Sequence, residues 1–130
     1  TLKIVFPTYT YFPEEILKGF QSFCREYAFN YQVVHQIADE QIQKGEVYIN
    51  LMEDDLVVLL GKIKSSNLIV GKNIGIISYN ETPWKQFILD GITTISTDFK
   101  RMGEMAAQMV LNDEKTKEEV PFALTLRRSL

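Results

Sequence analysis

Short apolar runs alternate with helix-like patterns along most of this chain. The runs have the length and β-branched content of buried strands and occupy residues 2–7, 31–37, 46–52 and 74–79. A stripe at three- and four-residue spacing follows the first run and is expected to be buried. It consists of Ile16, Phe20, Phe23, Cys24 and Tyr27. A second stripe follows the third run and consists of Leu56, Val57, Leu59, Leu60 and Ile63. The pattern predicts strand–helix units with right-handed crossovers and a parallel sheet.

Local signals mark where the two helices begin. Pro13 suits the first turn of a helix, and acidic residues 14–15 and 53–55 favour the positive N-terminal ends of the two helices. The polar stretch 39–44 is expected to form one short helical turn, and Gly45 ends it.

The last third continues the alternation. Residues 92–97 predict a further extended segment, and Asp98 is suited to cap a helix that ends near Leu111. Its apolar stripe consists of Phe99, Met102, Ala106, Met109 and Val110. Residues 112–119 read as a solvated linker, and 120–126 as a final strand with Pro121 near its start. We therefore expect a three-layer, doubly wound α/β fold with a parallel sheet of about five strands flanked by helices.

The size, composition and charge of the chain are those of a single globular domain without a basic surface for nucleic acid. A chain of 130 residues with 45% hydrophobic and 24% charged residues is one globular domain's worth. A net charge of −3 argues against nucleic-acid binding by these residues. The single cysteine, Cys24, excludes an internal disulfide and is expected to be a small buried hydrophobe. With no membrane-length apolar run and no signal-peptide pattern, we expect a soluble, cytoplasmic protein.

Residues for catalysis are scarce. One cysteine and one histidine cannot build a metal site, and Glu53-Asp54-Asp55 lacks the spaced ligands of a calcium loop. No glycine-rich phosphate loop or Gly-x-Ser-x-Gly elbow is present. His35, beside a β-branched strand, is expected to be a packed or surface histidine rather than a base. We expect no metal, no cofactor and no enzymatic activity.

Three loops should meet at the carboxyl ends of parallel strands, where open α/β sheets bind ligands. They span residues 8–14, 52–55 and 79–84, and they offer Tyr9, Thr10, Tyr11, Glu14, Glu53, Asp54, Asn80, Glu81 and Trp84. Carboxylates and amides bind hydroxyls and aromatic rings cover C–H surfaces, so this set favours a polyol or sugar, and no Lys or Arg is among it. The alternative is that these are simply polar loop ends.

Several motifs in a fixed order carry a family resemblance. They are the segment Ser78-Tyr79-Asn80-Glu81-Thr82-Pro83, then Ile92-Thr93-Thr94-Ile95 with Asp98-Phe99 and Met102-Gly103, and upstream Asp54-Asp55-Leu56 and Gly19-Phe20. In these motifs the chain resembles the LacI/GalR family of bacterial transcription regulators, most closely those fused to a GntR-type winged helix. The effector domain of that family has the type 1 periplasmic-binding-protein fold, with a ligand between two lobes.

The resemblance implies that residues 1–130 are the C-terminal lobe, and that a DNA-binding domain and most of the first lobe are absent from this chain. In the family the helix matching 98–111 packs on the first lobe. We therefore expect its stripe, Phe99, Met102 and Met109, to be covered by this lobe, by another chain or by a swapped copy.

The resemblance also implies roles for individual residues. Asn80 and Asp54 match ligand-contacting positions, and Glu14 falls where many members have a sugar-binding arginine. Trp84 is either a lid or stacking residue or part of a dimer contact. The implied function is sugar sensing by a homodimer that binds operator DNA through the absent domain. The alternatives are a solute-binding protein for sugar uptake and a small sugar-acting enzyme on the same scaffold.

Overall fold

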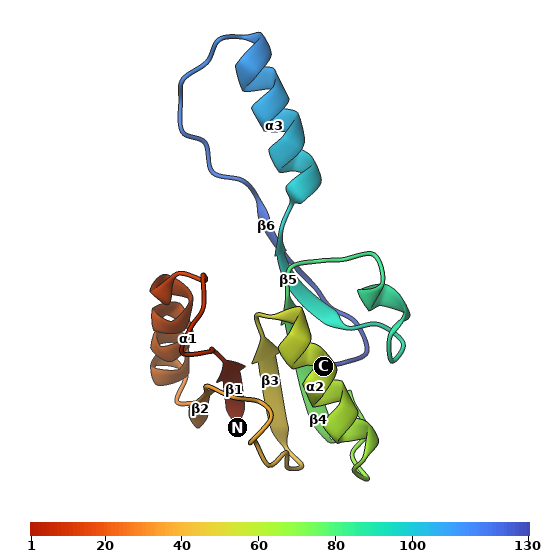
Figure 1. Cartoon of the computed structure of the whole chain (residues 1–130). Helices are drawn as coiled ribbons and strands as arrows, with labels where there is room; N and C mark the ends of the chain where they lie inside the picture. The colour runs from red at the N-terminus through yellow and green to blue at the C-terminus, as the bar shows by residue number, and fades with distance from the viewer.

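A computed structural model describes all residues, 1–130, and contains one six-stranded sheet (Figure 1). Its strands are β1 (Leu2–Val5), β2 (Tyr31–Val34), β3 (Glu46–Asn50), β4 (Ile74–Tyr79), β5 (Thr93–Thr97) and β6 (Phe122–Thr125). The order is β2-β1-β3-β4-β5-β6, and all neighbours are parallel except β5 and β6. The expected α/β fold class is confirmed, with a sixth strand that runs antiparallel at the edge.

Two helices pack on opposite faces of this sheet because neighbouring residues of a strand point to opposite sides. Ile4 packs with Phe20 and Cys24 of α1 (Glu14–Glu26), whereas Val5 belongs to the larger core with Leu56 of α2 (Glu53–Lys64). The two cores make the layered arrangement that the alternating pattern predicts.

The first helical stripe is only partly buried. Phe20 and Cys24 are buried, whereas Phe23 is 46% exposed and Tyr27 is 59% exposed. The expectation that all five stripe residues are buried is therefore wrong for these two. Phe23 stacks instead on Phe29, with ring centroids 5.7 Å apart, at the margin of α1.

The connection between β2 and β3 contains no helix, so the predicted helical turn at 39–44 is wrong. Polar contacts hold the connection in place. Lys3 of β1 forms ion pairs with Glu40 of the connection and, at 2.6 Å, with Glu46 of β3. The hydroxyl of Tyr48 donates to Glu46 at 2.7 Å. Glu40 and Glu46 satisfy the hydrogen-bond donors of the buried Lys3 ammonium group. The contact with Glu40 holds the connection against β1 without a helix.

The helix α3 (Phe99–Leu111) projects away from the sheet on the β5–β6 pair (Figure 1). Asp98 caps it as predicted, accepting a hydrogen bond from the Arg101 amide at 2.9 Å. No residue of α3 is buried, and Phe99 is 52% exposed. Coverage of its apolar stripe by this lobe is therefore ruled out by the structure, which leaves the other two expectations. None of the helices has the length and apolar character that a membrane span requires.

Candidate functional site

The loops after β1, β3 and β4 end at the same edge of the sheet. Val5, Asn50 and Ser78 are aligned across the three parallel strands, so the segments that follow them leave the sheet together. The loop after β1 also contacts the end of β4, because the rings of Phe12 and Tyr79 meet edge-to-face with centroids 5.4 Å apart. We call the surface formed by these three loops the carboxyl edge.

Asn80 occupies a strained position at this edge. Its φ of 63° lies in the left-handed region, where asparagine is among the few residues that are readily accommodated. Its N–H donates to the carbonyl of Ile95 at 2.8 Å, while its side chain makes no hydrogen bond within the chain. The backbone is therefore fixed and the amide group is free to bind a ligand.

Glu81 is engaged within the chain. Its carboxylate accepts hydrogen bonds from the Thr94 hydroxyl and from Nη1 of Arg127, the latter at 2.9 Å. Burial alone would raise the pKa of Glu81, but the hydrogen bonds of Arg127 and Thr94 and the charge of Arg127 outweigh it and lower the pKa. The geometry gives Glu81 a role in holding its loop to the β5–β6 pair.

The remaining sequence-predicted site residues lie on exposed parts of the edge. Asp54 is exposed in the first turn of α2, and Glu14 is exposed at the start of α1, 3.6 Å from Lys18. Tyr9 is 97% exposed and Tyr11 is 78% exposed. These four side chains are available to a partner but do not converge on an enclosed pocket in this chain.

Trp84 is partly buried and packs against the larger core. Next to it lies Lys85, which sequence reasoning did not place at the site. Its side chain is fully buried and donates to the carbonyls of Tyr79 and Asn80. One lysine in a loop of mixed polar and apolar residues gives no sequence pattern that indicates whether its side chain is buried or at the surface. The three loops themselves contain no Lys or Arg, but Lys85 and Arg127 approach them from outside their bounds, and both have partners within the chain.

Asn50, at the end of β3, is a second residue that the sequence did not single out. It is fully buried, and neither polar atom of its side chain has a hydrogen-bond partner within the chain. Such groups cost stability unless a water or another group satisfies them. Burial of Asn50 is decided by the packing of α2 over β3, which one strand's sequence does not reveal.

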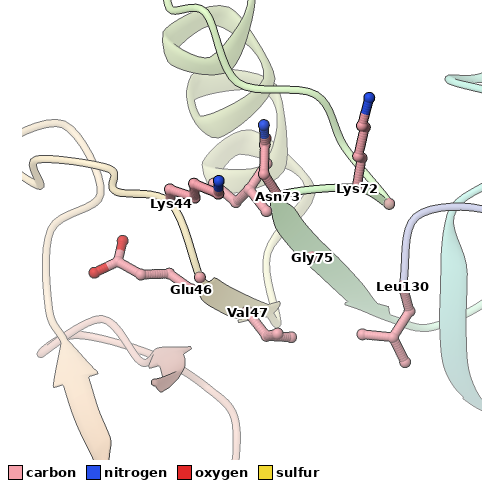
Figure 2. Close-up of a pocket in the computed structure, with 10 residues that line it drawn as sticks. Lys44, Glu46, Val47, Lys72, Asn73, Gly75 and Leu130 are labelled. Atoms are coloured by element: carbon pink, nitrogen blue, oxygen red, sulfur yellow. The ribbon is translucent and has the colours of Figure 1, made fainter.

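The surface has hollows at both edges of the sheet. One of about 550 Å³ lies between Glu81, Asp98 and Arg127, and another of about 380 Å³ includes Glu14 and His35. A smaller hollow at the opposite edge has a volume of about 300 Å³. Lys44, Lys72 and Leu130 border it (Figure 2). This third hollow includes none of the predicted site residues.

Sequence comparison and structure comparison gave different results. No protein-family model matches the sequence, and no curated protein matches it. Solved structures do match. A dimeric Lac repressor has a TM-score of 0.77 and 15% identity, over 98% of this chain and 54% of that chain. The Lac repressor bound to ONPG has a TM-score of 0.73 and 15% identity, over 99% and 45% of the respective chains.

A LacI family transcriptional regulator from Lactobacillus casei with bound sucrose also matches. Its TM-score is 0.73 at 12% identity, over 99% of this chain and 56% of that chain. The chain thus spans about half the length of these solved structures. At such identities the likeness shows the fold. This chain has the mixed α/β fold of a LacI-like, periplasmic-binding-protein-like lobe.

Proposed function

We propose that this chain is one lobe of the effector-binding part of a bacterial transcription regulator, and that its carboxyl edge forms one wall of a carbohydrate site. The observation that carries the proposal is Asn80, whose backbone is fixed while its side-chain amide is left free. An amide held in this way can donate to one sugar hydroxyl and accept from another.

The charges at this edge favour an uncharged ligand. Glu14 and Asp54 present exposed carboxylates, which accept hydrogen bonds from hydroxyl groups. The cations beside the loop after β4, Lys85 and Arg127, are held by acceptors within the chain. Lys18, beside Glu14, is paired with Glu14 and Glu15. A phosphorylated sugar would meet negative charge without a free cation, so a neutral sugar or polyol fits better.

The proposed mechanism follows from a ligand held between two lobes. A sugar that bridges the lobes stabilises one interlobe geometry over another, and the population of that state rises by differential affinity. In a dimeric regulator of the GntR-fused kind that the sequence motifs resemble, this shift changes the affinity for operator DNA. Because a regulator of this kind binds operator DNA, we propose that the protein is cytoplasmic.

The helix α3 extends the proposal to a second protein surface. Phe99 and Met102 are exposed, and Val110 is 81% exposed, so the apolar stripe lacks a partner within the lobe. We propose that it packs on the companion lobe of a longer protein or on a second copy. Size-exclusion chromatography with light scattering tests the second arrangement: Met102→Lys should shift a dimer to monomer, and an unchanged mass would exclude α3 from the contact.

A thermal-shift screen of the full gene product tests the ligand class. The panel contains neutral pentoses, hexoses, disaccharides including sucrose, and their phosphorylated forms. We expect a neutral sugar to raise Tm and its phosphorylated form to raise it less. If only phosphorylated sugars stabilise the protein, the charge argument is wrong, and the carboxyl edge is not the site in the form proposed.

A further inference from the structure

Lys85 is fully buried beneath the loop that follows β4, at the start of the short helix η1 (Lys85–Phe87). Its Nζ lies 2.6 Å from the carbonyl oxygen of Asn80 and 3.1 Å from that of Tyr79. The third neighbour is Oε1 of Glu53, at 3.3 Å. An ammonium group has three N–H donors, so these three acceptors can satisfy it completely.

Lys85 and β5 hold the two backbone polar groups of Asn80. The N–H of Asn80 donates to Ile95 of β5, and the carbonyl of Asn80 accepts from Lys85. A left-handed backbone at a residue other than glycine persists where the surroundings stabilise it. These two hydrogen bonds stabilise the left-handed backbone of Asn80, and they thereby fix the direction in which its side chain leaves the loop.

The same ammonium group connects the loop to α2. Glu53, which pairs with Lys85, also accepts a hydrogen bond from the hydroxyl of Thr82 at 3.3 Å. Glu53 directly precedes Asp54 in the first turn of α2. Lys85 therefore lies where the segments that carry Asn80 and Asp54 are held against each other.

We propose that Lys85 is a positioning residue for ligand binding. Its buried ammonium group fixes Asn80 and the first turn of α2 relative to each other, and it does so without contacting the ligand. The part of this inference that concerns ligand binding rests on the proposed function, whereas the part that concerns the loop does not. The effect of Lys85 on the loop can be measured in the 130-residue chain alone.

Protonation of Lys85 gives an independent readout. Burial lowers the pKa of this amine from its ordinary value of 10.5, although the hydrogen bond and charge of Glu53 and the charge of Glu81 oppose the change. The facing charged groups are Glu53 from α2 and Glu81 from the loop, and Arg127 is paired with Glu81. The amine therefore loses its proton, and one donor to the loop, at a lower pH than a surface lysine does.

The protein's only tryptophan reports this step, since Nζ of Lys85 lies 5.8 Å from the centre of the Trp84 ring. We expect Trp84 fluorescence to change with a midpoint below pH 10.5, and Lys85→Met to abolish that transition. A transition that is the same in both proteins would overturn the assignment of Lys85 to this loop.

Amide hydrogen exchange by NMR tests the positioning role directly. In Lys85→Met, we expect protection of the Asn80 amide to fall at least tenfold, while the Ile76 amide within the sheet keeps its protection. The matched control is Lys64→Met, which removes an exposed lysine at the far end of α2. Equal protection of Asn80 in Lys85→Met and in the wild type would overturn the proposal.

A second variant keeps the test decisive if Lys85→Met does not fold. Glu53→Gln preserves the size of the side chain but removes the charge that supports the ammonium group. The Trp84 transition should then move to a lower pH than in the wild type. An unchanged midpoint would contradict the proposed contact between Lys85 and Glu53.

Binding separates this inference from the proposed function. We take the neutral sugar with the largest thermal shift and compare its Kd for the wild type, Lys85→Met and Asn80→Ala. An increase of tenfold or more in both variants supports both proposals. An increase in Asn80→Ala alone overturns the role of Lys85 and leaves the site intact. No increase in either variant overturns the site and, with it, the binding role of Lys85.

Discussion

Glu81 and Arg127 form an ion pair of 2.9 Å although 46 residues separate them in the chain. Glu81 lies in the loop after β4, and Arg127 follows β6, the strand that returns from α3. The same Nη1 of Arg127 also donates to the carbonyl of Ile92 at 2.8 Å. The carboxyl edge is thereby tied to the two strands that lead into and out of α3.

Removal of Arg127 should destabilise the fold. Arg127→Met leaves Glu81 and the Ile92 carbonyl without this donor, and hydrogen bonds to charged groups contribute about 1.5–3 kcal/mol. We expect the free energy of unfolding in urea to fall by about 2 kcal/mol. Arg101→Met is the matched control, because the Arg101–Glu104 pair is exposed and such pairs contribute about 0–1 kcal/mol. Equal losses in the two variants would contradict the role given to Arg127.

The pH dependence of stability should contain a contribution from Glu81. Its pKa is lowered in the folded protein, because its hydrogen bonds and Arg127 outweigh the effect of burial. The stabilisation is therefore present above the ordinary glutamate value of 4.5 and is lost as pH falls through the lowered pKa. Urea unfolding of Glu81→Gln from pH 6 to pH 3 should show a smaller loss of stability than the wild type. An identical slope in the two proteins would show that Glu81 is not stabilised in its charged form.

The sequence was sufficient for the fold and for parts of the edge. The alternation of apolar runs and helical stripes was enough to predict β1, β3, β4, α1 and α2, because apolar residues repeat at different spacings in strands and in helices. Asp98 was identifiable as a cap because that role depends on a residue type at one local position. The absence of a helix from the connection before β3 could not be predicted, because the contact between Glu40 and Lys3 joins residues that are distant in the sequence.

The same distinction applies to the candidate site. Asn80 and Asp54 follow predicted strands, so their place at the carboxyl edge could be predicted from the order of elements. The ion pair of Glu81 with Arg127 could not be predicted, because it depends on the antiparallel pairing of β6 with β5. Burial of Lys85 likewise depends on Glu53, which lies 32 residues earlier in the printed sequence.

Two glycines should respond in opposite directions to alanine. Gly71 has a φ of +74°, and a Cβ there would lie 1.9 Å from the carbonyl oxygen of Arg128. Gly71→Ala should therefore lower the free energy of unfolding by about 3 kcal/mol or more, through strain and displacement of the C-terminal segment. Gly61, within α2, has open space at its Cβ position, and Gly61→Ala should raise stability by about 0.5–1 kcal/mol. A small effect at Gly71 would contradict the close approach of residue 128.

Ser129 should be the main anchor of the C-terminal segment. Its hydroxyl donates to the carbonyl of Ile76 and accepts from the amide of Thr93, both at 2.7 Å, and the residue is fully buried. Ser129→Ala would leave both backbone groups without this partner, at a cost of about 1–3 kcal/mol. Differential scanning calorimetry should show a lower Tm, whereas Ser22→Ala on the exposed side of α1 should leave Tm nearly unchanged. Similar Tm values for both variants would contradict the anchoring role.

The most direct test of the account is the affinity of the full gene product for its best neutral sugar, measured by isothermal titration calorimetry. Asn80→Ala removes the amide proposed to bind sugar hydroxyls, and Asn67→Ala removes an exposed amide beyond the other end of α2. The two neutral hydrogen bonds of the amide contribute about 1–3 kcal/mol together, which corresponds to a Kd that rises roughly 5- to 160-fold. We expect such a rise for Asn80→Ala and an unchanged Kd for Asn67→Ala. An unchanged Kd for Asn80→Ala would contradict the proposal that this edge of the sheet binds the ligand.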